Sequence, residues 1–240
     1  FPFEAEVYRK YKCDVEFVGH PLLDIVHPTM TKEEAEEHFG ARKDAKKVLL
    51  MPGSRKQEVL SLLDTMLKSG EQLMANHEDI QFFLPRAHTI DRSELETFID
   101  VHKVPVTITE DHTYDLMQIC DVCLAASGTA TLETAMMELP TVLLYRVSLI
   151  TYGIGKMVVN VTHVGLPNIV AGKEVIPELL QDAVTPKAIV SIVEPLLTDV
   201  EKNKAMRSEL REVRHKLGEP GAVKRVAELV YNLGKEKCNE

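Results

Sequence analysis

The sequence predicts an α/β protein built on a parallel sheet with helices on both faces. One observation is that short apolar runs, typical of strands, alternate with longer segments whose apolar residues recur at helical spacing. The other is that two of these runs end in glycine turns that open helices, at Gly53 and at Gly128. Strands that alternate with helices favour a parallel sheet covered on both sides.

The first third of the chain sets the pattern. We expect a short helix at 3–11, a strand at 15–18 that ends at Gly19-His20-Pro21, and a charged helix at about 31–39. The apolar run 48–51 is broken by Pro52-Gly53-Ser54-Arg55. The segment after this turn is amphipathic, with these residues at helical spacing: Val59, Leu62, Leu63, Met66, Leu67 and Leu73.

The alternation continues as far as Tyr145 and then changes. Further strands are expected at 80–84, 106–108, 122–126 and 142–145, with helices at 93–101, at 114–119 and after Ser127. Beyond Arg146 the segment 149–161 is apolar with scattered glycines, and Gly165-Leu166-Pro167-Asn168 is typical of a loop. Helices are expected at 177–180, 186–197, 200–217 and 223–233.

Composition excludes several classes of protein. The 240 residues carry a formal net charge of -9, which argues against nucleic acid as the main partner. No uninterrupted apolar run approaches the length of a membrane span, and no signal peptide is recognisable. The cysteines form no disulfide framework, which suits a reducing cytoplasm; they are Cys13, Cys120, Cys123 and Cys238. Because the chain starts Phe1-Pro2-Phe3, we expect it to be a fragment of a longer protein.

The turn at Ser127 is the strongest candidate site. Ser127 is placed to cap the helix that follows, whose free N–H groups and dipole favour an anion, most often phosphate. Gly128 has no Cβ, so a diphosphate could approach the backbone closely. Glu133 lies about one and a half turns into the helix, where its carboxylate could accept hydrogen bonds from a ribose diol. The alternative is an ordinary capped helix whose glutamate faces water.

The second turn supports the first. Arg55 would bring a permanent charge to the mouth of a crevice at the carboxyl ends of the strands, where ligands bind in open sheets. The alternative is a solvated surface arginine. Cys120 and Cys123 are spaced as in redox motifs, but we expect them to be two small buried hydrophobic residues. No paired aspartates are present to hold a metal-bound diphosphate, so no metal and no cofactor is expected, and the scattered histidines favour structural or solvated roles.

A further apolar stripe falls on one helical face within 150–161. It is compatible with a membrane-surface helix or with a surface for acyl chains. A helix that faces the core is the more common cause of such a stripe.

Together these motifs resemble those of lipid-A-disaccharide synthases. The resemblance runs from Phe1 to about Leu180, more loosely beyond, and rests on segments in the same order and spacing: Val18-Gly-His-Pro21, Pro52-Gly-Ser-Arg55, Ala126-Ser-Gly-Thr-Ala-Thr-Leu-Glu133, Tyr145-Arg146 and Leu166-Pro-Asn-Ile-Val-Ala-Gly172. The family adopts the double-Rossmann (GT-B) fold. The resemblance therefore implies that this chain is the Rossmann-like, C-terminal, donor-binding half, followed by C-terminal helices.

The resemblance also implies an activity and a site. Members transfer a 2,3-diacylglucosamine from its UDP carrier to 2,3-diacylglucosamine 1-phosphate, with inversion and release of UDP. Arg55 would neutralise the diphosphate, Glu133 would hold the ribose, Tyr145 and Arg146 would line the uracil pocket, and Asn168 would reach the donor's phosphate or sugar. The full substrate-binding set is Gly53, Ser54, Arg55, Ser127, Gly128, Thr129, Ala130, Thr131, Glu133, Tyr145, Arg146 and Asn168.

The resemblance divides the chain into three parts. Residues 1–24 correspond to the end of the amino-terminal domain and the crossover, 25–216 to the donor domain, and 217–240 to a helix that packs toward the other half. The family's general base lies in the half that is absent, so no catalytic residue is assigned. The resemblance further implies a cytoplasmic location with peripheral contact at the inner membrane of Gram-negative bacteria. A homo-oligomer is compatible with the resemblance, which does not fix the oligomeric state.

Two alternatives to this function remain at the level of sequence. One is another UDP-sugar enzyme of the same fold, such as the peptidoglycan glycosyltransferase or the UDP-N-acetylglucosamine epimerase. The other is a non-catalytic nucleotide-binding module. A nicotinamide dehydrogenase is disfavoured, because no Gly-x-Gly-x-x-Gly follows the first strand.

Overall fold

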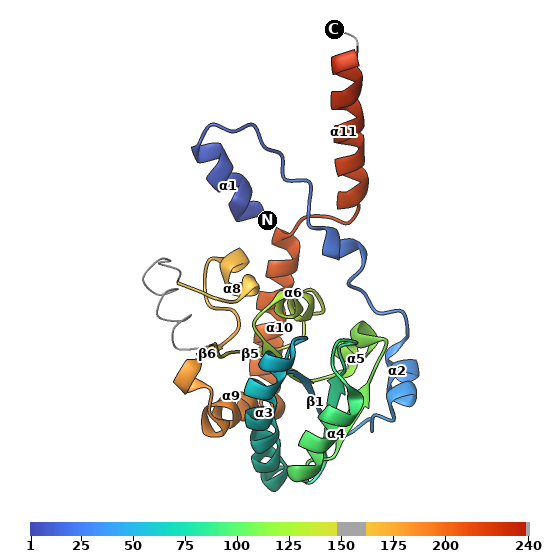
Figure 1. The fold of residues 1–240 in the computed structure, drawn as a ribbon, viewed down its shortest axis with the longest axis vertical. Helices are drawn as coiled ribbons and strands as arrows, with labels where there is room; N and C mark the ends of the chain where they lie inside the picture. The colour runs from blue at the N-terminus through green and yellow to red at the C-terminus, as the bar shows by residue number, and fades with distance from the viewer. Residues whose placement is uncertain (148–161, 239–240) are drawn as a thin grey trace.

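A six-stranded parallel sheet organises the chain, with strand order β3-β2-β1-β4-β5-β6. The computed structural model describes residues 1–147 and 162–238 (Figure 1). The strands are β1 Lys46–Met51, β2 Ile80–Pro85, β3 Val106–Thr109, β4 Val122–Ala126, β5 Thr141–Tyr145 and β6 Glu178–Leu180. The helices are α1 Pro2–Lys10, α2 Lys32–Phe39, α3 Lys56–Asn76, α4 Arg92–Val101, α5 Thr113–Ile119, α6 Thr129–Met136, α8 Leu166–Ala171, α9 Pro186–Thr198, α10 Val200–Lys216 and α11 Ala222–Cys238.

Helices cover both faces of the sheet, which confirms the predicted fold class. In β1, Val48 and Leu50 pack into a core shared with α3, α4 and α9. Leu49 points to the opposite face and packs with residues of α2 and α5. All three side chains are fully buried, because successive residues of a strand point to opposite faces and each face is covered. Helices α6, α8 and α10 supply the remainder of the second face.

The segments that enter and leave the sheet domain cross each other at two glycines. A Cβ placed on Gly218 would lie 3.1 Å from the Cα of Gly19, and both glycines have positive φ. The guanidinium of Arg225, in α11, binds carbonyl oxygens on both sides of the crossing: Nε donates to Val18 (2.8 Å) and Nη1 to Pro220 (2.8 Å). Residues 17–20 and 217–221 are thus bonded into one unit. Figure 1 shows α1 and α11 at the same end of the molecule, away from the sheet.

Three predicted elements are wrong. Residues 15–18 form no strand; their backbone bonds toward the C-terminal segment instead, as in the Val18 carbonyl that accepts from Arg225. The expected helix at 177–180 is the edge strand β6, since Leu143 donates to the Pro177 carbonyl and a proline is tolerated at the start of an edge strand. The expected loop at 165–168 opens α8, because Pro167 fits a first helical turn.

The apolar stripe predicted within 150–161 lies outside the described residues. None of the helices in the described parts of the chain is both long and apolar enough to cross a membrane.

Candidate functional site

The two glycine turns follow neighbouring strands at the point where the strand order reverses. From β1 the chain moves outward to β2 and β3, and then returns to place β4 on the other side of β1. In open parallel sheets this reversal creates a crevice at the carboxyl ends of the strands, and ligands bind there. A cavity of about 740 Å³ lies at this position, and both turns line it. The prediction that the two turns share one crevice is confirmed.

The first turn of α6 presents its backbone to the cavity. Gly128 is the N-cap, in an extended conformation (φ 161°, ψ -167°), and no side chain caps the helix. Ser127 was expected to be the cap, but its N–H still belongs to the sheet and donates to the Leu144 carbonyl at 3.1 Å. A Cβ added to Gly128 would meet no atom within 4 Å. Open space therefore adjoins a helix N-terminus, which is an arrangement that binds anions.

The turn after β1 brings Arg55 to the mouth of the cavity. Gly53 has a φ of +114°, and a Cβ there would lie 2.6 Å from Oε2 of Glu58, so only glycine fits. Arg55 is the N-cap of α3, its side chain is 83% exposed, and its Nη1 lies 3.0 Å from Oε1 of Glu58. An ion pair this exposed contributes little stability, so the guanidinium can exchange Glu58 for a ligand at small cost.

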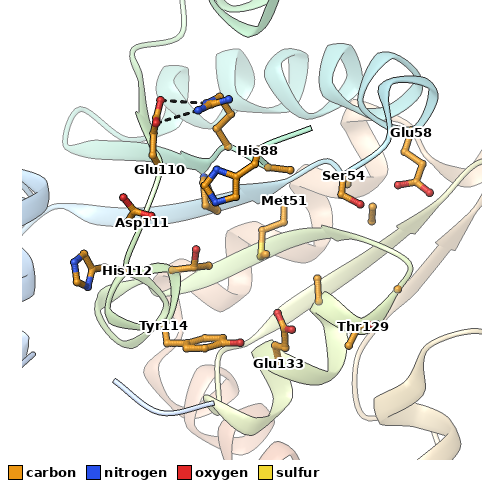
Figure 2. A pocket seen from close by; sticks show the side chains of 18 of the residues that line it. Met51, Ser54, Glu58, His88, Glu110, Asp111, His112, Tyr114, Thr129 and Glu133 are labelled. Atoms are coloured by element: carbon orange, nitrogen blue, oxygen red, sulfur yellow. Dashed lines mark hydrogen bonds and ion pairs between the residues drawn. The ribbon is translucent and has the colours of Figure 1, made fainter. Parts of the chain in front are cut away.

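Glu133 projects from α6 into the cavity beside Tyr114 of α5. Figure 2 shows the Tyr114 hydroxyl directed toward the Glu133 carboxylate. Burial raises the pKa of Glu133, and burial followed by the negative charge of Glu133 raises the pKa of Tyr114. Within the described residues, no hydrogen bond or ion pair engages the Glu133 side chain. The cavity therefore holds a partly desolvated acceptor without a partner, which suits a ligand that donates hydrogen bonds.

Loops after β2 and β3 form the opposite wall of the cavity, and none of their residues belongs to the predicted substrate-binding set. His88 follows β2, and Glu110, Asp111 and His112 follow β3 (Figure 2). Nη2 of Arg86 lies 2.9 Å from Oε2 of Glu110, and this ion pair joins the two loops. No glycine marks these loops, but the rule that ligands lie at carboxyl ends applies to every strand of the sheet and would have indicated them.

Asp115 anchors this wall to the segment that leads into α2. Its carboxylate is 3% exposed and accepts hydrogen bonds from the N–H groups of Thr29 and Met30, both at 2.6 Å. Although burial alone would raise the pKa of Asp115, the hydrogen bonds from Met30 and Thr29 lower it overall. The charged form of Asp115 is therefore part of the folded structure, and it fixes one rim of the cavity.

Four residues of the predicted set do not line the cavity. Thr131 is fully buried, and its hydroxyl donates to the Gly128 carbonyl. Arg146 donates to the carbonyls of Ser61 (2.9 Å) and Val184 (2.7 Å), and Tyr145 packs against the core on the second face. Asn168 is fully buried; its Oδ1 accepts from two backbone N–H groups and its Nδ2 donates to the Ile176 carbonyl. These hydrogen bonds and core contacts account for the positions of the four side chains.

The cavity is acidic in its described lining. Two arginines, Arg55 and Arg86, face five carboxylates: Glu58, Glu110, Asp111, Asp115 and Glu133. Since Arg86 is committed to Glu110, the exposed Arg55 is the adjustable cation of this lining. No group of three or more His, Cys, Asp or Glu side chains in the described ranges is arranged to hold a metal ion.

Comparison with known proteins places the chain. The family model for lipid-A-disaccharide synthetase matches residues 1–230. Lipid-A-disaccharide synthase of Syntrophus aciditrophicus is 44% identical over 236 residues, covering 98% of this chain and 62% of the relative. The same enzyme of Geobacter sulfurreducens is 41% identical, again covering 98% and 62%. The chain thus spans about three fifths of the length of these curated relatives.

A solved structure supports the fold alone. The UDP-GlcNAc 2-epimerase from Neisseria meningitidis, in a crystal structure bound to UDP-GlcNAc, superposes with a TM-score of 0.64 at 16% identity, covering 90% of this chain and 54% of the epimerase chain. On the match of the family model and the identity to curated relatives, the chain belongs to the lipid-A-disaccharide synthetase family.

Proposed function

We propose that the chain binds the nucleotide of a UDP-sugar donor in the cavity between β1 and β4. The observation that carries this proposal is the convergence of the Gly53 turn, the first turn of α6 and Glu133 on one cavity at the switch point of the sheet. A uridine diphosphate offers a group for each: phosphates for the backbone N–H groups and a ribose diol for the carboxylate. The family to which the chain belongs, and the UDP-GlcNAc held by a protein of similar fold, support the choice of nucleotide.

The diphosphate would lie between the two glycine turns. The N–H groups from Gly128 to Ala130 and the positive end of the α6 dipole would bind its oxygens, and Gly128 leaves room for close approach. Arg55 would leave Glu58 and bind the phosphates, neutralising the charge that develops as UDP departs. The acidic lining makes this cation and these dipoles necessary, because the other described carboxylates repel phosphate.

The nucleoside would point away from the turns. Glu133 would accept hydrogen bonds from the ribose hydroxyls, and the donation of two such bonds offsets the cost of a partly buried carboxylate. The base would then lie toward the wall formed by the loops after β2 and β3, where His88 and Asp111 lie.

The reaction proposed for the whole protein is the family's hexosyl transfer. A 2,3-diacylglucosamine would pass with inversion from UDP to 2,3-diacylglucosamine 1-phosphate, giving lipid A disaccharide 1-phosphate and UDP. We assign the described residues to donor binding and propose that the general base and the acceptor site belong to the remainder of a protein with the relatives' length. Residues 25–216 would form the donor domain, with 1–24 as the crossover.

The proposed surroundings follow from the acyl chains of both substrates. The whole protein would act in the cytoplasm at the surface of the inner membrane, as a monomer or a homo-oligomer. We propose that α11 packs toward the rest of the protein, because it exposes a row of apolar side chains: Val223, Val226, Val230, Tyr231 and Leu233.

Calorimetric titration tests the nucleotide site. The chain is titrated with UDP, UMP and NAD, first without and then with magnesium. UDP binding that exceeds that of UMP and NAD and needs no metal is the expected result. Equal affinity for UDP and NAD, or no heat with UDP, would contradict the proposal.

A further inference from the structure

The N-terminal ends of α5 and α6 supply facing parts of the cavity wall. Tyr114 and Asp115 belong to the first turn of α5, Gly128 is the N-cap of α6, and Thr129, Ala130 and Glu133 belong to α6. A ligand that contacts both parts therefore depends on the distance between the two helices. Both helices run from the carboxyl edge of the sheet toward the amino edge, so their C-terminal ends lie at the edge opposite the cavity.

Arg207 of α10 joins those C-terminal ends. Its Nη1 donates to the carbonyl of Glu138, just after α6, at 2.9 Å, and its Nη2 donates to the carbonyl of Cys120, the C-cap of α5, at 3.1 Å. Its Nε donates to Oδ1 of Asn203 at 2.8 Å, and Asn203 in turn donates to the Asp121 carbonyl at 3.0 Å. One planar guanidinium thus bonds to both helix ends, and its bond to Asn203 fixes its orientation.

The surroundings of Arg207 are consistent with a link between helices and not with a second ligand site. Burial lowers the pKa of Arg207. A cavity of about 510 Å³ adjoins it. Besides Arg207, two cations of its lining already bind main-chain carbonyls: Lys47 those of Lys43 and Ala45, and Arg214 that of Met136. Lys32 also lines this cavity. Cations at helix C-termini satisfy the last carbonyls and favour the helix dipole.

We propose that Arg207 is a positioning residue for the nucleotide site, which holds α5 and α6 at the separation that lets one ligand contact both. This inference rests on the proposed function, since it concerns the same ligand. Arg207 lies on the far side of the sheet domain from the cavity lining and acts through the two helices. Substitution of Arg207 changes no residue of the lining but frees one helix end from the other.

Arg211 and Arg214 provide matched controls on the same helix. Arg211 makes two bonds to the carboxylate of Glu138 (3.1 and 2.6 Å), and Arg214 donates to the Met136 carbonyl at 2.8 Å. Each contacts the end of α6 without reaching α5. Substitution of either removes a cation and its bonds from the end of α6 and keeps the link between the two helices.

The experiment compares Arg207→Met with Arg211→Met and Arg214→Met. Dissociation constants are measured for UDP, which would contact both walls, and for pyrophosphate, which would contact only the glycine turns. Arg207→Met is expected to weaken UDP by about tenfold, the loss of one charged hydrogen bond to the ligand, and pyrophosphate by less than about twofold. Both control variants should keep the wild-type ratio of the two constants.

Amide hydrogen exchange of the ligand-free protein gives a second measurement. The amides of α5 should exchange faster in Arg207→Met than in either control, at equal global stability. If Arg207→Met does not fold, Arg207→Lys, which keeps the charge but loses the planar fork, carries the same comparison.

The possible results separate the two proposals. A fall in melting temperature with an unchanged ratio and unchanged α5 exchange would show that Arg207 is only structural, and would overturn the inference. If the wild-type protein binds no UDP, the proposed function fails and the inference fails with it. If wild type binds UDP and Arg207→Met binds both ligands as wild type does, only the inference fails.

Discussion

Gly128→Ala should leave the fold intact and greatly weaken nucleotide binding. The added methyl group would meet no protein atom within 4 Å, and the extended backbone of Gly128 is available to alanine. Loss of glycine's freedom in the unfolded chain adds about 0.4–1 kcal/mol of stability. Alanine is a poorer N-cap than glycine by about 0.5–1 kcal/mol. These effects nearly cancel, so the melting temperature should stay close to that of the wild type.

Binding should respond very differently. The methyl group would occupy the space beside the first-turn N–H groups of α6, where we place the diphosphate. Loss of two charge-assisted hydrogen bonds would cost about 3 kcal/mol or more, which is about a hundredfold in affinity. Calorimetric titration with UDP measures this loss, and thermal unfolding of the same samples measures stability.

Gly53→Ala provides the contrast. There a Cβ would lie 2.6 Å from Oε2 of Glu58 and the φ is +114°, so the substitution should destabilise the fold by about 1–3 kcal/mol. Our reasoning about the diphosphate would be refuted if Gly128→Ala were folded and bound UDP within about threefold of wild type, a difference of less than about 0.7 kcal/mol. A large fall in the stability of Gly128→Ala would refute the statement that the space beside Gly128 is open to a methyl group.

Four further predictions concern three charged residues of the cavity. Arg55→Ala should weaken UDP by about 1.5–3 kcal/mol with little change in melting temperature, since its pair with Glu58 is exposed; unchanged affinity in calorimetry would remove Arg55 from the site. Glu133→Ala should weaken UDP more than pyrophosphate, and equal losses would argue against contact with the ribose. Burial raises the folded-state pKa of Glu133, so the stability that its protonated form contributes is lost as pH rises above about 4.5 and through the folded-state pKa. Glu133→Gln should therefore gain stability relative to wild type over this rise in pH. A pH-independent difference in denaturant unfolding would contradict the assignment. Asp115→Asn should destabilise by about 1–3 kcal/mol at neutral pH, because the lowered folded pKa makes its contribution present above about 3.8 and lost as pH falls through the folded pKa; a gap that persists in acid would argue against this account.

The parts of the fold that could be predicted from sequence are those with strong local signals. The run 48–51 and its glycine turn, and the run 122–126 with the turn at Ser127, are correct because burial on both faces demands continuous apolar residues. The helix predicted at 177–180 is wrong, since a three-residue strand is too short to show a period and forms only where β5 offers an edge. The free edge of β5 exists only in the folded sheet, so the spacing of residues along the chain cannot predict a strand at 178–180.

The candidate site was predicted on one side only. Arg55, Gly128 and Glu133 belong to motifs whose turn chemistry is visible in the sequence, and they line the cavity. Tyr114 and Asp111 follow strands without a glycine signature, so only the completed strand order brings them to the same edge. Asn168 came from family resemblance, and the structure places its amide in a buried turn between α8 and β6, where its bonds are satisfied locally.

The crossing at Gly19 and Gly218 has a mechanical consequence. Because Arg225 binds carbonyl oxygens of both segments, a rotation applied to α11 is transmitted to residues 17–20 as torque. A domain attached to both segments would rotate about a single hinge, at the contact of the two glycines, and not about two independent linkers. A protein shortened before Arg225 would lose the bonds that this arginine makes across the crossing, while keeping both glycines and every residue of the nucleotide cavity.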